Sequence, residues 1–206
     1  MVIIGICGGT SSGKSTVAQR IKKEIACSCE ILSQDCYYVD QGDKPFEERK
    51  QVDYDDPKIF EHDTLLEDVR ALIEGRTITK KGYDFANHRR ADTDERIAPP
   101  DVLIIEGIHA LHDKRLRQLM DLRIYVSVDA DTCLIRRIRR DIAERGRETD
   151  NILAQYEKTV KPAFDKYIKN YESKADISIN NNKDYKVAVE MIIAYAEKKA
   201  AEKKEK

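Results

Sequence analysis

The stretch Gly8-Gly9-Thr10-Ser11-Ser12-Gly13-Lys14-Ser15 decides the fold of this chain. It matches G-x-x-x-x-G-K-[ST], the phosphate-binding P-loop. An apolar run, residues 2–7, precedes it, and a helical pattern follows. In such a loop the glycines let backbone N–H groups turn toward phosphate oxygens, and the new helix presents its positive end to the same anion. The stretch therefore predicts a nucleoside-triphosphate site between a strand and a helix, rather than a fortuitous glycine turn.

The motif assigns a part to each of its polar residues. Lys14 is expected to reach the β- and γ-phosphates, and the Ser15 hydroxyl is expected to ligate Mg²⁺. The residues predicted to bind the nucleotide are Gly8, Gly9, Thr10, Ser11, Ser12, Gly13, Lys14, Ser15 and Thr16.

Length, composition and charge exclude several classes of protein. The 206 residues suit one domain, 1–206, and 36% charged against 41% hydrophobic residues indicate a globular protein with a charged surface. A net charge of −1 argues against a nucleic-acid partner. Because there is no secretory signal and no apolar run long enough to span a membrane, we expect a cytoplasmic protein without a membrane partner. An odd, scattered set of cysteines predicts free thiols: Cys7, Cys27, Cys29, Cys36 and Cys133.

Apolar runs alternate with helical patterns along the chain, which predicts an α/β fold with a P-loop NTPase-type parallel sheet flanked by helices. The expected strands are 2–7, 30–34, 102–106, 122–128 and 175–179. The expected helices are 14–27, 63–74, 113–120, 131–145, 149–170 and 184–203, with a kink or break at Pro162. Residues 76–98 lack an intervening helix, so we expect a small antiparallel β flap there.

Two acids follow predicted strands. Ligands of open parallel sheets bind beyond the carboxyl ends of the strands, where Asp35 and Glu106 fall. Asp35 could take a proton from an attacking hydroxyl or reach Mg²⁺ through water; the alternative is an acid that caps a turn. Glu106, after the apolar run 102–105, resembles a Walker B acid that holds Mg²⁺ through water; the alternative is a loop cap.

An arginine-rich helix is expected to cover the phosphates. Leu134, Ile138 and Ile142 form an apolar stripe at i, i+4 and i+8, which leaves the arginines off that stripe. In one interpretation the arginines are a solvated face, paired as Arg137–Asp141 and Arg140–Glu144. Because clustered arginines repel one another unless an anion is near, we instead expect a lid at 130–150 with Gly146 as a hinge.

Two polar–aromatic clusters lie outside the core pattern, at 52–57 and 83–88. An aromatic platform with neighbouring hydrogen-bonding groups suits a nucleobase or a sugar. His88, in the second cluster, could equally be a surface or capping residue.

Taken together, the motifs resemble the uridine kinase (uridine–cytidine kinase) family, within the group of P-loop kinases that includes the phosphoribulokinases. The matching stretches follow the family order: GGTSSGKS, LSQDCYY, YDDPKIFEHDTLL, YDFANH, VLIIEGI, DADTCLIRRIRRDIAERGR, ILAQYEKTVKPAF and ADISI. They cover most of residues 1–180, and ERGR…QY…TVKP is the most specific of them.

The resemblance implies transfer of the γ-phosphate of ATP or GTP to the 5′-hydroxyl of uridine or cytidine, with Mg²⁺. It implies that Asp35 is the general base and that Lys14, Arg137, Arg140 and Arg145 act on the phosphates. The implied metal residues are Ser15, Glu106 and Asp35. The implied substrate residues are Tyr38, Asp55, Tyr83, His88, Arg137, Arg147 and Gln155, with Asp55 and Arg147 on the ribose and Tyr83 and His88 on the pyrimidine. The family also suggests a homo-oligomer, a tetramer.

Two stretches depart from the family pattern. After the last strand, where the family often has a Pro-Arg-Gly-Gly-like segment near the adenine, this chain has 180–184, which ends in Asp184. We nevertheless expect Asp184 to take part in nucleotide binding. The run 108–111, which contains His109, leans toward the phosphoribulokinase branch.

The departures leave two alternatives to a pyrimidine nucleoside kinase. The first is a sibling kinase of another small alcohol, such as a sugar phosphate held by Arg89 and Arg90. The second is a nucleotide switch, which the displaced acid in Asn182-Lys183-Asp184-Tyr185 disfavours as a guanine-reading N-K-x-D.

Overall fold

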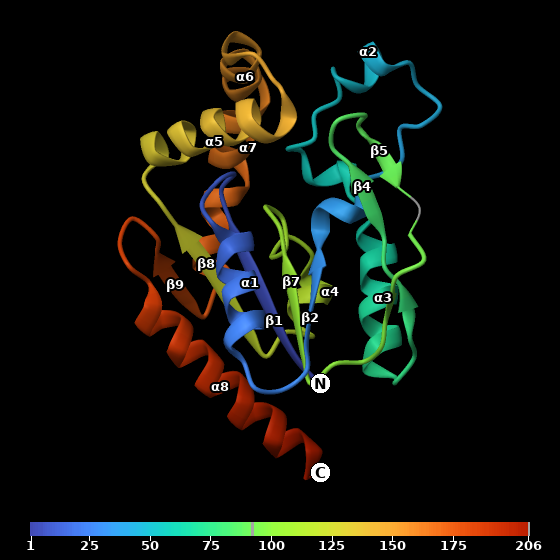
Figure 1. Ribbon diagram of the computed structural model, residues 1–206, viewed down its shortest axis with the longest axis vertical. Helices are drawn as coiled ribbons and strands as arrows, with labels where there is room; N and C mark the ends of the chain where they lie inside the picture. Colours follow the sequence, from blue (N-terminus) through green and yellow to red (C-terminus); the bar gives the residue numbers. More distant parts are fainter. Residues whose placement is uncertain (92, 206) are drawn as a thin grey trace.

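A five-stranded parallel sheet forms the centre of the molecule in the computed structural model, which describes residues 1–91 and 93–205 (Figure 1). The strand order is β2-β7-β1-β8-β9. The bounds are β1 Val2–Gly8, β2 Cys29–Ser33, β7 Val102–Glu106, β8 Leu122–Ser127 and β9 Ile177–Asn180. The expected parallel α/β sheet is therefore confirmed, and β1, which leads into the P-loop, lies at its middle.

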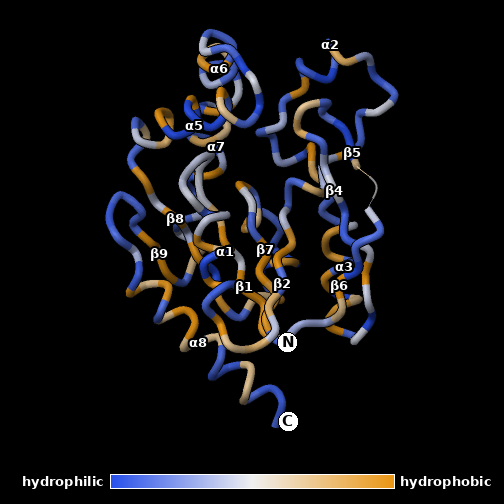
Figure 2. The backbone as a smooth tube through the Cα atoms, in the orientation of Figure 1, coloured by the Kyte–Doolittle hydropathy of each residue, from blue (hydrophilic) through white to orange (hydrophobic). Residues whose placement is uncertain are grey.

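Alternate residues of the central strands face two apolar layers. On one face, Val2, Ile4 and Ile6 pack with α1 and α8. On the other, Ile3 packs with α3 and α4. These helices span Lys14–Glu24 (α1), His62–Ile73 (α3), Lys114–Arg117 (α4) and Lys186–Lys204 (α8). Because both faces are covered, residues 102–105 of β7 are fully buried, as expected for a parallel strand of continuous apolar character. Figure 2 shows this apolar centre between charged outer surfaces.

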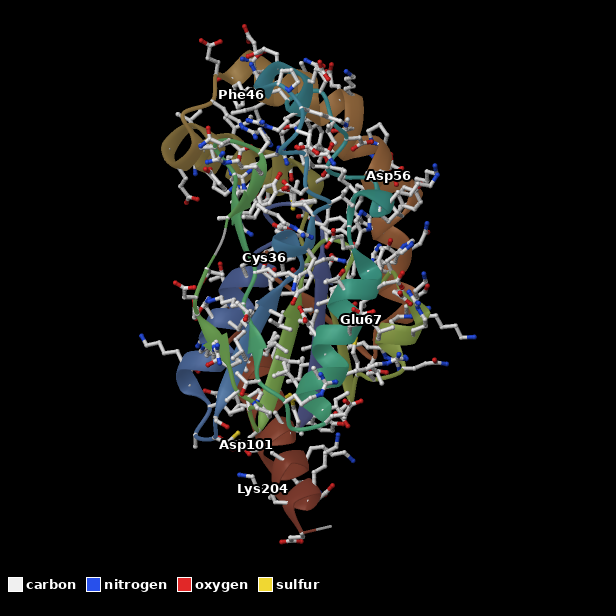
Figure 3. All side chains as sticks on the ribbon, turned by 90° about the vertical axis from the view of Figure 1, so that its right-hand side faces the viewer. Cys36, Phe46, Asp56, Glu67, Asp101 and Lys204 are labelled. Atoms are coloured by element: carbon white, nitrogen blue, oxygen red, sulfur yellow. The ribbon has the colours of Figure 1, made fainter. Side chains whose placement is uncertain are left out.

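The N-terminus and the end of α8 lie together, at the edge of the sheet opposite the P-loop (Figure 1). Lys204 near the end of α8 binds Asp101 before β7, with a Nζ–Oδ1 distance of 2.7 Å, and Figure 3 labels both residues at that end of the molecule. The carboxyl ends of the strands, with the P-loop, lie at the opposite edge of the sheet (Figure 1).

Several short helical segments on one side of that edge replace the long helix expected at 149–170. They are α6 Thr149–Gln155, a π-helical turn at Tyr156–Val160 and α7 Lys161–Lys166, followed by a 3₁₀ segment, Ile168–Lys174. Pro162 stands in the first turn of α7, where its missing N–H is not needed, and the wide turn lies just before it. Residues 149–166 thus stay helical through Pro162, and the expected kink or break takes the form of the π-helical turn before it.

On the side of the molecule that carries α3, the expected flap is two separate antiparallel ribbons, one beside the lower part of α3 and one nearer the P-loop end (Figures 1 and 2). One pairs β3 Ile78–Thr79 with β6 Arg96–Ile97, and Ile78 and Ile97 join the core beneath α3. The other pairs β4 Gly82–Asp84 with β5 Arg89–Ala91. A short helix, α2 Phe46–Arg49, lies at the same end of the molecule as the second ribbon, where Figure 3 labels Phe46. Only strand β5 of the second ribbon was not predicted, because it contains two arginines and no apolar pattern.

Helix α5, Ala130–Arg145, packs through a different face from the one its apolar stripe suggests. Ile142 is 46% exposed, whereas Arg137 is 5% exposed and Asp141 is completely buried. The apolar stripe is only partly covered, with Leu134 and Ile138 half-buried, because a buried ion cluster, described below, takes the inner face of the helix. Gly146, at φ +60°, ends the helix in the left-handed conformation that suits glycine.

Among the described residues, no helix is long and apolar enough to cross a membrane. All five cysteines are free thiols in the structure.

Candidate active site

The P-loop joins β1 to α1 in a conformation that depends on glycine. Gly13 precedes the first residue of α1 at φ +89°, where a Cβ atom would also overlap the side-chain amide of Asn181. That amide donates a hydrogen bond of 2.7 Å to the backbone oxygen of Ser12. The loop is therefore fixed from the β9 side, and the first backbone N–H groups of α1 point out of the helix, where they suit an anion.

Register places the acid of β7 beside the P-loop helix. Glu106 pairs with Ile6 of β1 and with Ser33 of β2, and its carboxylate accepts a hydrogen bond of 3.0 Å from the Ser15 hydroxyl. Burial raises the pKa of Glu106, while the nearby Lys14 ammonium opposes that rise. A hydroxyl and a carboxylate within 3.0 Å of each other offer the hard oxygen ligands that Mg²⁺ takes together with phosphate oxygens and water, so these residues fit the ion.

Most of the predicted site residues line one cavity of about 610 Å³ at the carboxyl edge of the sheet. They come from the P-loop, the segment after β2, the 52–57 loop, the β4–β5 ribbon and the helices α5 and α6. The predicted residues on its walls are Thr10, Lys14, Asp35, Tyr38, Asp55, Tyr83, His88, Arg137, Arg140, Arg145, Arg147 and Gln155. The structure therefore brings together the residues expected for a phosphate donor and those expected for an acceptor.

Two carboxylates, those of Asp35 and Asp55, line this cavity. Asp35 follows β2 in a 3₁₀ turn, Gln34–Tyr37, and accepts a hydrogen bond of 3.4 Å from the Tyr38 hydroxyl. Asp55 is 8% exposed, and its carboxylate accepts a hydrogen bond of 3.1 Å from the Thr159 hydroxyl. Burial raises the pKa of Asp55, and the positive charge of Arg137 opposes that effect. Asp35 therefore lies beside Tyr38, and Asp55 lies beside the π-helical turn that carries Thr159.

Aromatic rings form one wall of the cavity. Tyr38 stacks on Phe60 with ring centroids 4.5 Å apart and lies 4.9 Å from the ring of Tyr83. Tyr54 stacks on His88 at 5.0 Å with an angle of 20° between the planes. A planar base could lie against such a wall.

His88 is held at the end of the β4–β5 turn. Asp84 accepts hydrogen bonds of 3.0 Å from the backbone N–H groups of Ala86 and Asn87. These bonds shape the turn before His88, whose own φ is +50°. The Arg147 guanidinium approaches Nε2 of His88 at 3.4 Å, so this nitrogen is the acceptor. Burial, together with the charge of Arg147, lowers the pKa of His88 to about 4. His88 is therefore a neutral ring near pH 7, with its proton on Nδ1.

Two arginines meet on one amide oxygen. Arg137 donates from Nη2 to Gln155 Oε1 at 2.8 Å, and Arg147 donates from Nη1 to the same atom at 2.9 Å. Arg137 also donates from Nη1 to the Thr10 hydroxyl of the P-loop at 3.1 Å. Gln155 thus links the phosphate side of the cavity to the side that carries His88.

Asp141 is the counterion of the arginine cluster, and it was not among the predicted site residues. Its Oδ1 atom accepts hydrogen bonds from Nε and Nη2 of Arg140 at 2.9 and 2.8 Å. Nitrogens of Arg145, Arg137 and Arg147 lie 3.3, 3.7 and 3.7 Å from its oxygens. Burial acts to raise the pKa of Asp141, but Arg140, Arg145 and Arg137 together hold it below its usual value. Of the two ion pairs in the solvated-face interpretation, Arg137–Asp141 is present, whereas Arg140 pairs with Asp141 rather than with Glu144.

Sequence reasoning also missed three wall residues, Tyr54, Phe85 and Ile108. Tyr54 and Phe85 lie within the two clusters that had been recognised, so their aromatic character was the available signal. The Arg145 guanidinium lies over the ring of Phe85, 4.9 Å from its centroid, in a cation–π contact.

A few candidates lie away from the cavity walls. Asp184 accepts a hydrogen bond of 2.9 Å from the backbone N–H of Lys186, at the beginning of α8. Arg90 pairs with Glu61, and neither Arg89 nor Arg90 lines the cavity. A nucleotide-binding role for Asp184 stays a prediction.

Comparison with known proteins gives the same assignment. Residues 3–188 match the model of the phosphoribulokinase/uridine kinase family. The chain is 43% identical over 194 residues to a uridine kinase of Clostridium botulinum (strain Kyoto / Type A2), a match that covers 94% of each chain. It is 42% identical over 193 residues to a uridine kinase of Bacillus subtilis (strain 168), which covers 93% of this chain and 92% of the relative.

Solved structures agree at the level of the fold. A phosphoribulokinase from Rhodobacter spheroides superimposes with a TM-score of 0.62 at 18% identity, over 87% of this chain and 69% of that one. The family match spans both the P-loop and the residues that surround the cavity. The chain belongs to the phosphoribulokinase/uridine kinase family.

Proposed function

We propose that the protein transfers the γ-phosphate of ATP or GTP to the 5′-hydroxyl of uridine or cytidine, giving UMP or CMP in pyrimidine salvage. Membership of the family supports a phosphotransferase, and relatives named uridine kinase support a nucleoside acceptor. The observation that carries the proposal is the shared cavity, in which Lys14 and Asp35 face the same space as Asp55 and His88.

In the proposed reaction Asp35 is the general base. Its carboxylate takes the proton of the 5′-hydroxyl as the new O5′–Pγ bond forms, and the bond from Pγ to the bridging oxygen of the β-phosphate breaks to release the nucleoside diphosphate. The Tyr38 hydroxyl, 3.4 Å from Asp35 Oδ1, holds the carboxylate toward the cavity. Asp35 thereby acts on the acceptor while the P-loop holds the donor.

Positive charge around the cavity stabilises the transferred phosphoryl group. Lys14 approaches from the P-loop, and Arg137, Arg140 and Arg145 approach from α5. Because they are fixed before the reaction, they need little reorganisation as negative charge develops on the phosphate oxygens. Ser15 and Glu106 would hold Mg²⁺, which supplies further charge neutralisation when bound. We propose that α5 and the segment to residue 150 act as a lid on this site.

The acceptor half of the cavity suits a pyrimidine nucleoside. Asp55 would accept hydrogen bonds from ribose hydroxyls, with Arg147 beside it. Tyr54, Tyr83 and His88 would contact the base through ring faces and a hydrogen bond. A histidine can donate or accept according to its tautomer, so both uracil and cytosine are proposed substrates. The proposed assembly is a homo-oligomer, a tetramer as in the family resemblance.

The alternatives receive less support. The arginines suggested for a sugar-phosphate acceptor, Arg89 and Arg90, are not on the cavity wall, and Arg90 is paired with Glu61. A nucleotide switch needs no acceptor pocket, whereas carboxylate and aromatic side chains line the space beside Lys14.

The test is a coupled assay of nucleoside diphosphate release, ADP from ATP or GDP from GTP, with uridine, cytidine, ribulose 5-phosphate and pantothenate as acceptors. We expect turnover with the two nucleosides only. Faster phosphorylation of ribulose 5-phosphate than of uridine would contradict the proposal, as would hydrolysis that no acceptor stimulates.

A further inference from the structure

The turn after β7 contains a buried histidine that the proposed reaction does not use. His109 is 1% exposed and follows Ile108, which is on the cavity wall. Its own ring is absent from that wall and lies instead among Phe60, Tyr167 and Tyr171, with centroids 5.6, 6.0 and 5.7 Å away. A buried imidazole requires a hydrogen-bond partner for each of its two ring nitrogens. Which nitrogen donates and which accepts then shows what the ring holds in place.

The partners of His109 determine which nitrogen carries the proton. Nε2 lies 2.7 Å from the backbone oxygen of Asp55, and because a carbonyl only accepts, Nε2 donates. Burial lowers the pKa of His109 to about 4, so the ring is neutral near pH 7 and Nδ1 carries no proton. Nδ1 lies 2.8 Å from the Tyr171 hydroxyl, so the hydroxyl donates to it.

One further bond extends this chain toward the surface. Nδ1 of His112 lies 2.8 Å from the same Tyr171 oxygen. Because the single proton of the hydroxyl is already used, His112 must donate from Nδ1. The donors therefore run in one direction, from His112 to Tyr171, from Tyr171 to His109, and from His109 to the backbone of Asp55.

The end point of the chain is the loop that presents the acceptor carboxylate. The N–H group of Asp55 donates to Asp53 Oδ1 at 2.9 Å, and the Asp55 carboxylate accepts from the Thr159 hydroxyl at 3.1 Å. His109 supplies the remaining contact, at the backbone oxygen, from the side away from the cavity. Donor, acceptor and side chain of Asp55 are thus each fixed by a different residue.

We infer that His109 is a positioning residue for the acceptor, held by Tyr171 so that its Nε2–H group fixes the backbone of Asp55 and thereby the carboxylate that faces the nucleoside. The inference rests on the proposed function, because it concerns the ribose hydroxyls that Asp55 would bind. It assigns a role on the acceptor side to the histidine of the 108–111 run.

The test compares His109→Leu with His109→Gln. The Gln side chain can place an amide N–H near the position of Nε2, whereas Leu fills the space without a donor. For His109→Leu we expect the KM for uridine to rise about five- to tenfold, as loss of a buried hydrogen bond implies, with the KM for ATP within about twofold of the wild type. We expect His109→Gln to recover most of the loss.

A second variant serves if His109→Leu does not fold. Tyr171→Phe removes the donor to Nδ1, and it should raise the KM for uridine by a smaller factor than His109→Leu. Tyr195→Phe is the matched control, because the Tyr195 hydroxyl also bonds a backbone oxygen, that of Asp121, on the distant helix α8. It should leave both KM values unchanged.

Nitrogen-15 NMR of the free wild-type protein gives a readout that does not depend on turnover. We expect the proton of the His109 ring on Nε2 and that of the His112 ring on Nδ1. A proton on Nδ1 of His109, or equal uridine KM values in the wild type, His109→Leu and Tyr171→Phe, would overturn the inference alone. A wild-type protein without nucleoside turnover would overturn the proposed function and, with it, the acceptor role of His109.

Discussion

Asp141 accepts two hydrogen bonds from the guanidinium of Arg140, from Nε at 2.9 Å and from Nη2 at 2.8 Å, at a position with no solvent exposure. Arg137, Arg145 and Arg147 surround the same carboxylate. One buried acid therefore balances a group of cations that the proposed reaction needs close together. Without an anion, arginines at this spacing would repel one another and turn outward to water.

The first prediction concerns this acid. Asp141→Asn keeps an oxygen for Arg140 but removes the charge that offsets the other arginines. We expect it to lower the free energy of unfolding by about 3 kcal/mol, as when one partner of a buried ion pair is removed. Urea denaturation measures the change. Asp165→Asn, which alters an exposed ion pair with Lys161, is the control and should cost less than about 1 kcal/mol. Equal effects of the two substitutions would contradict a structural role for Asp141.

The same acid predicts a pH dependence of stability. The pKa of Asp141 is lower in the folded protein than in the unfolded chain, where it is about 3.9. Its contribution is therefore complete above the unfolded value and is lost as the pH falls through the folded value. We expect the difference in unfolding free energy between the wild type and Asp141→Asn to be constant from neutral pH to about pH 5 and to shrink below about pH 4. A difference that grows on acidification would refute the assigned sign.

A further prediction concerns Asp35, the proposed general base. Asp35→Asn should lower kcat by about 10² or more, as loss of a general base implies, while the Kd for ATP changes little. Steady-state kinetics and calorimetric titration with ATP measure the two quantities. Asp43→Asn, at an exposed position of the following loop, is the control. Near-normal turnover by Asp35→Asn would remove Asp35 as the base.

The metal residues can be tested by the concentration of magnesium that activity requires. Glu106→Gln keeps the size of the side chain next to Ser15 but removes its charge. The half-saturating Mg²⁺ concentration should rise about tenfold or more, as for other residues that orient metal-bound water. Glu30→Gln changes an acid on β2 that pairs with Lys22, and it should leave that concentration unchanged. An unaltered magnesium requirement in Glu106→Gln would argue that Glu106 only anchors Ser15.

The proposed contact of His88 with the base gives a prediction in which cytidine serves as the control for uridine. His88 is neutral with its proton on Nδ1, because Arg147 approaches Nε2, and such a donor suits the 4-oxo group of uracil. His88→Tyr should therefore lower kcat/KM for uridine more than for cytidine, since a fixed hydroxyl cannot serve both exocyclic groups equally. The ratio of the two values is the measurement. Equal losses would mean that His88 does not read the base.

Much of the site was predictable because its residues stand in local patterns. The P-loop spacing identified Lys14 and Ser15 as candidates, and the acids were found because Asp35 directly follows one predicted strand and Glu106 ends another. The aromatic clusters at 52–57 and 83–88 supplied the aromatic wall of the cavity. Asp141 and His109 were not recognised as site residues. An acid within an arginine-rich helix is typical of an exposed ion pair with a neighbouring arginine, and a single histidine belongs to no sequence motif.

The sequence by itself determined the strand–loop–helix start, the alternating elements and the parallel sheet, since periodicity and turn chemistry act within short stretches of chain. That α5 buries Arg137 and Asp141, and leaves Ile142 of its apolar stripe exposed, follows from the packing of the folded chain. The same packing lets Tyr171 orient His109 toward Asp55, across 62 and 54 residues of chain. Burial of charge and the direction of a hydrogen bond depend on partners distant in sequence, and those partners meet only when the chain is folded.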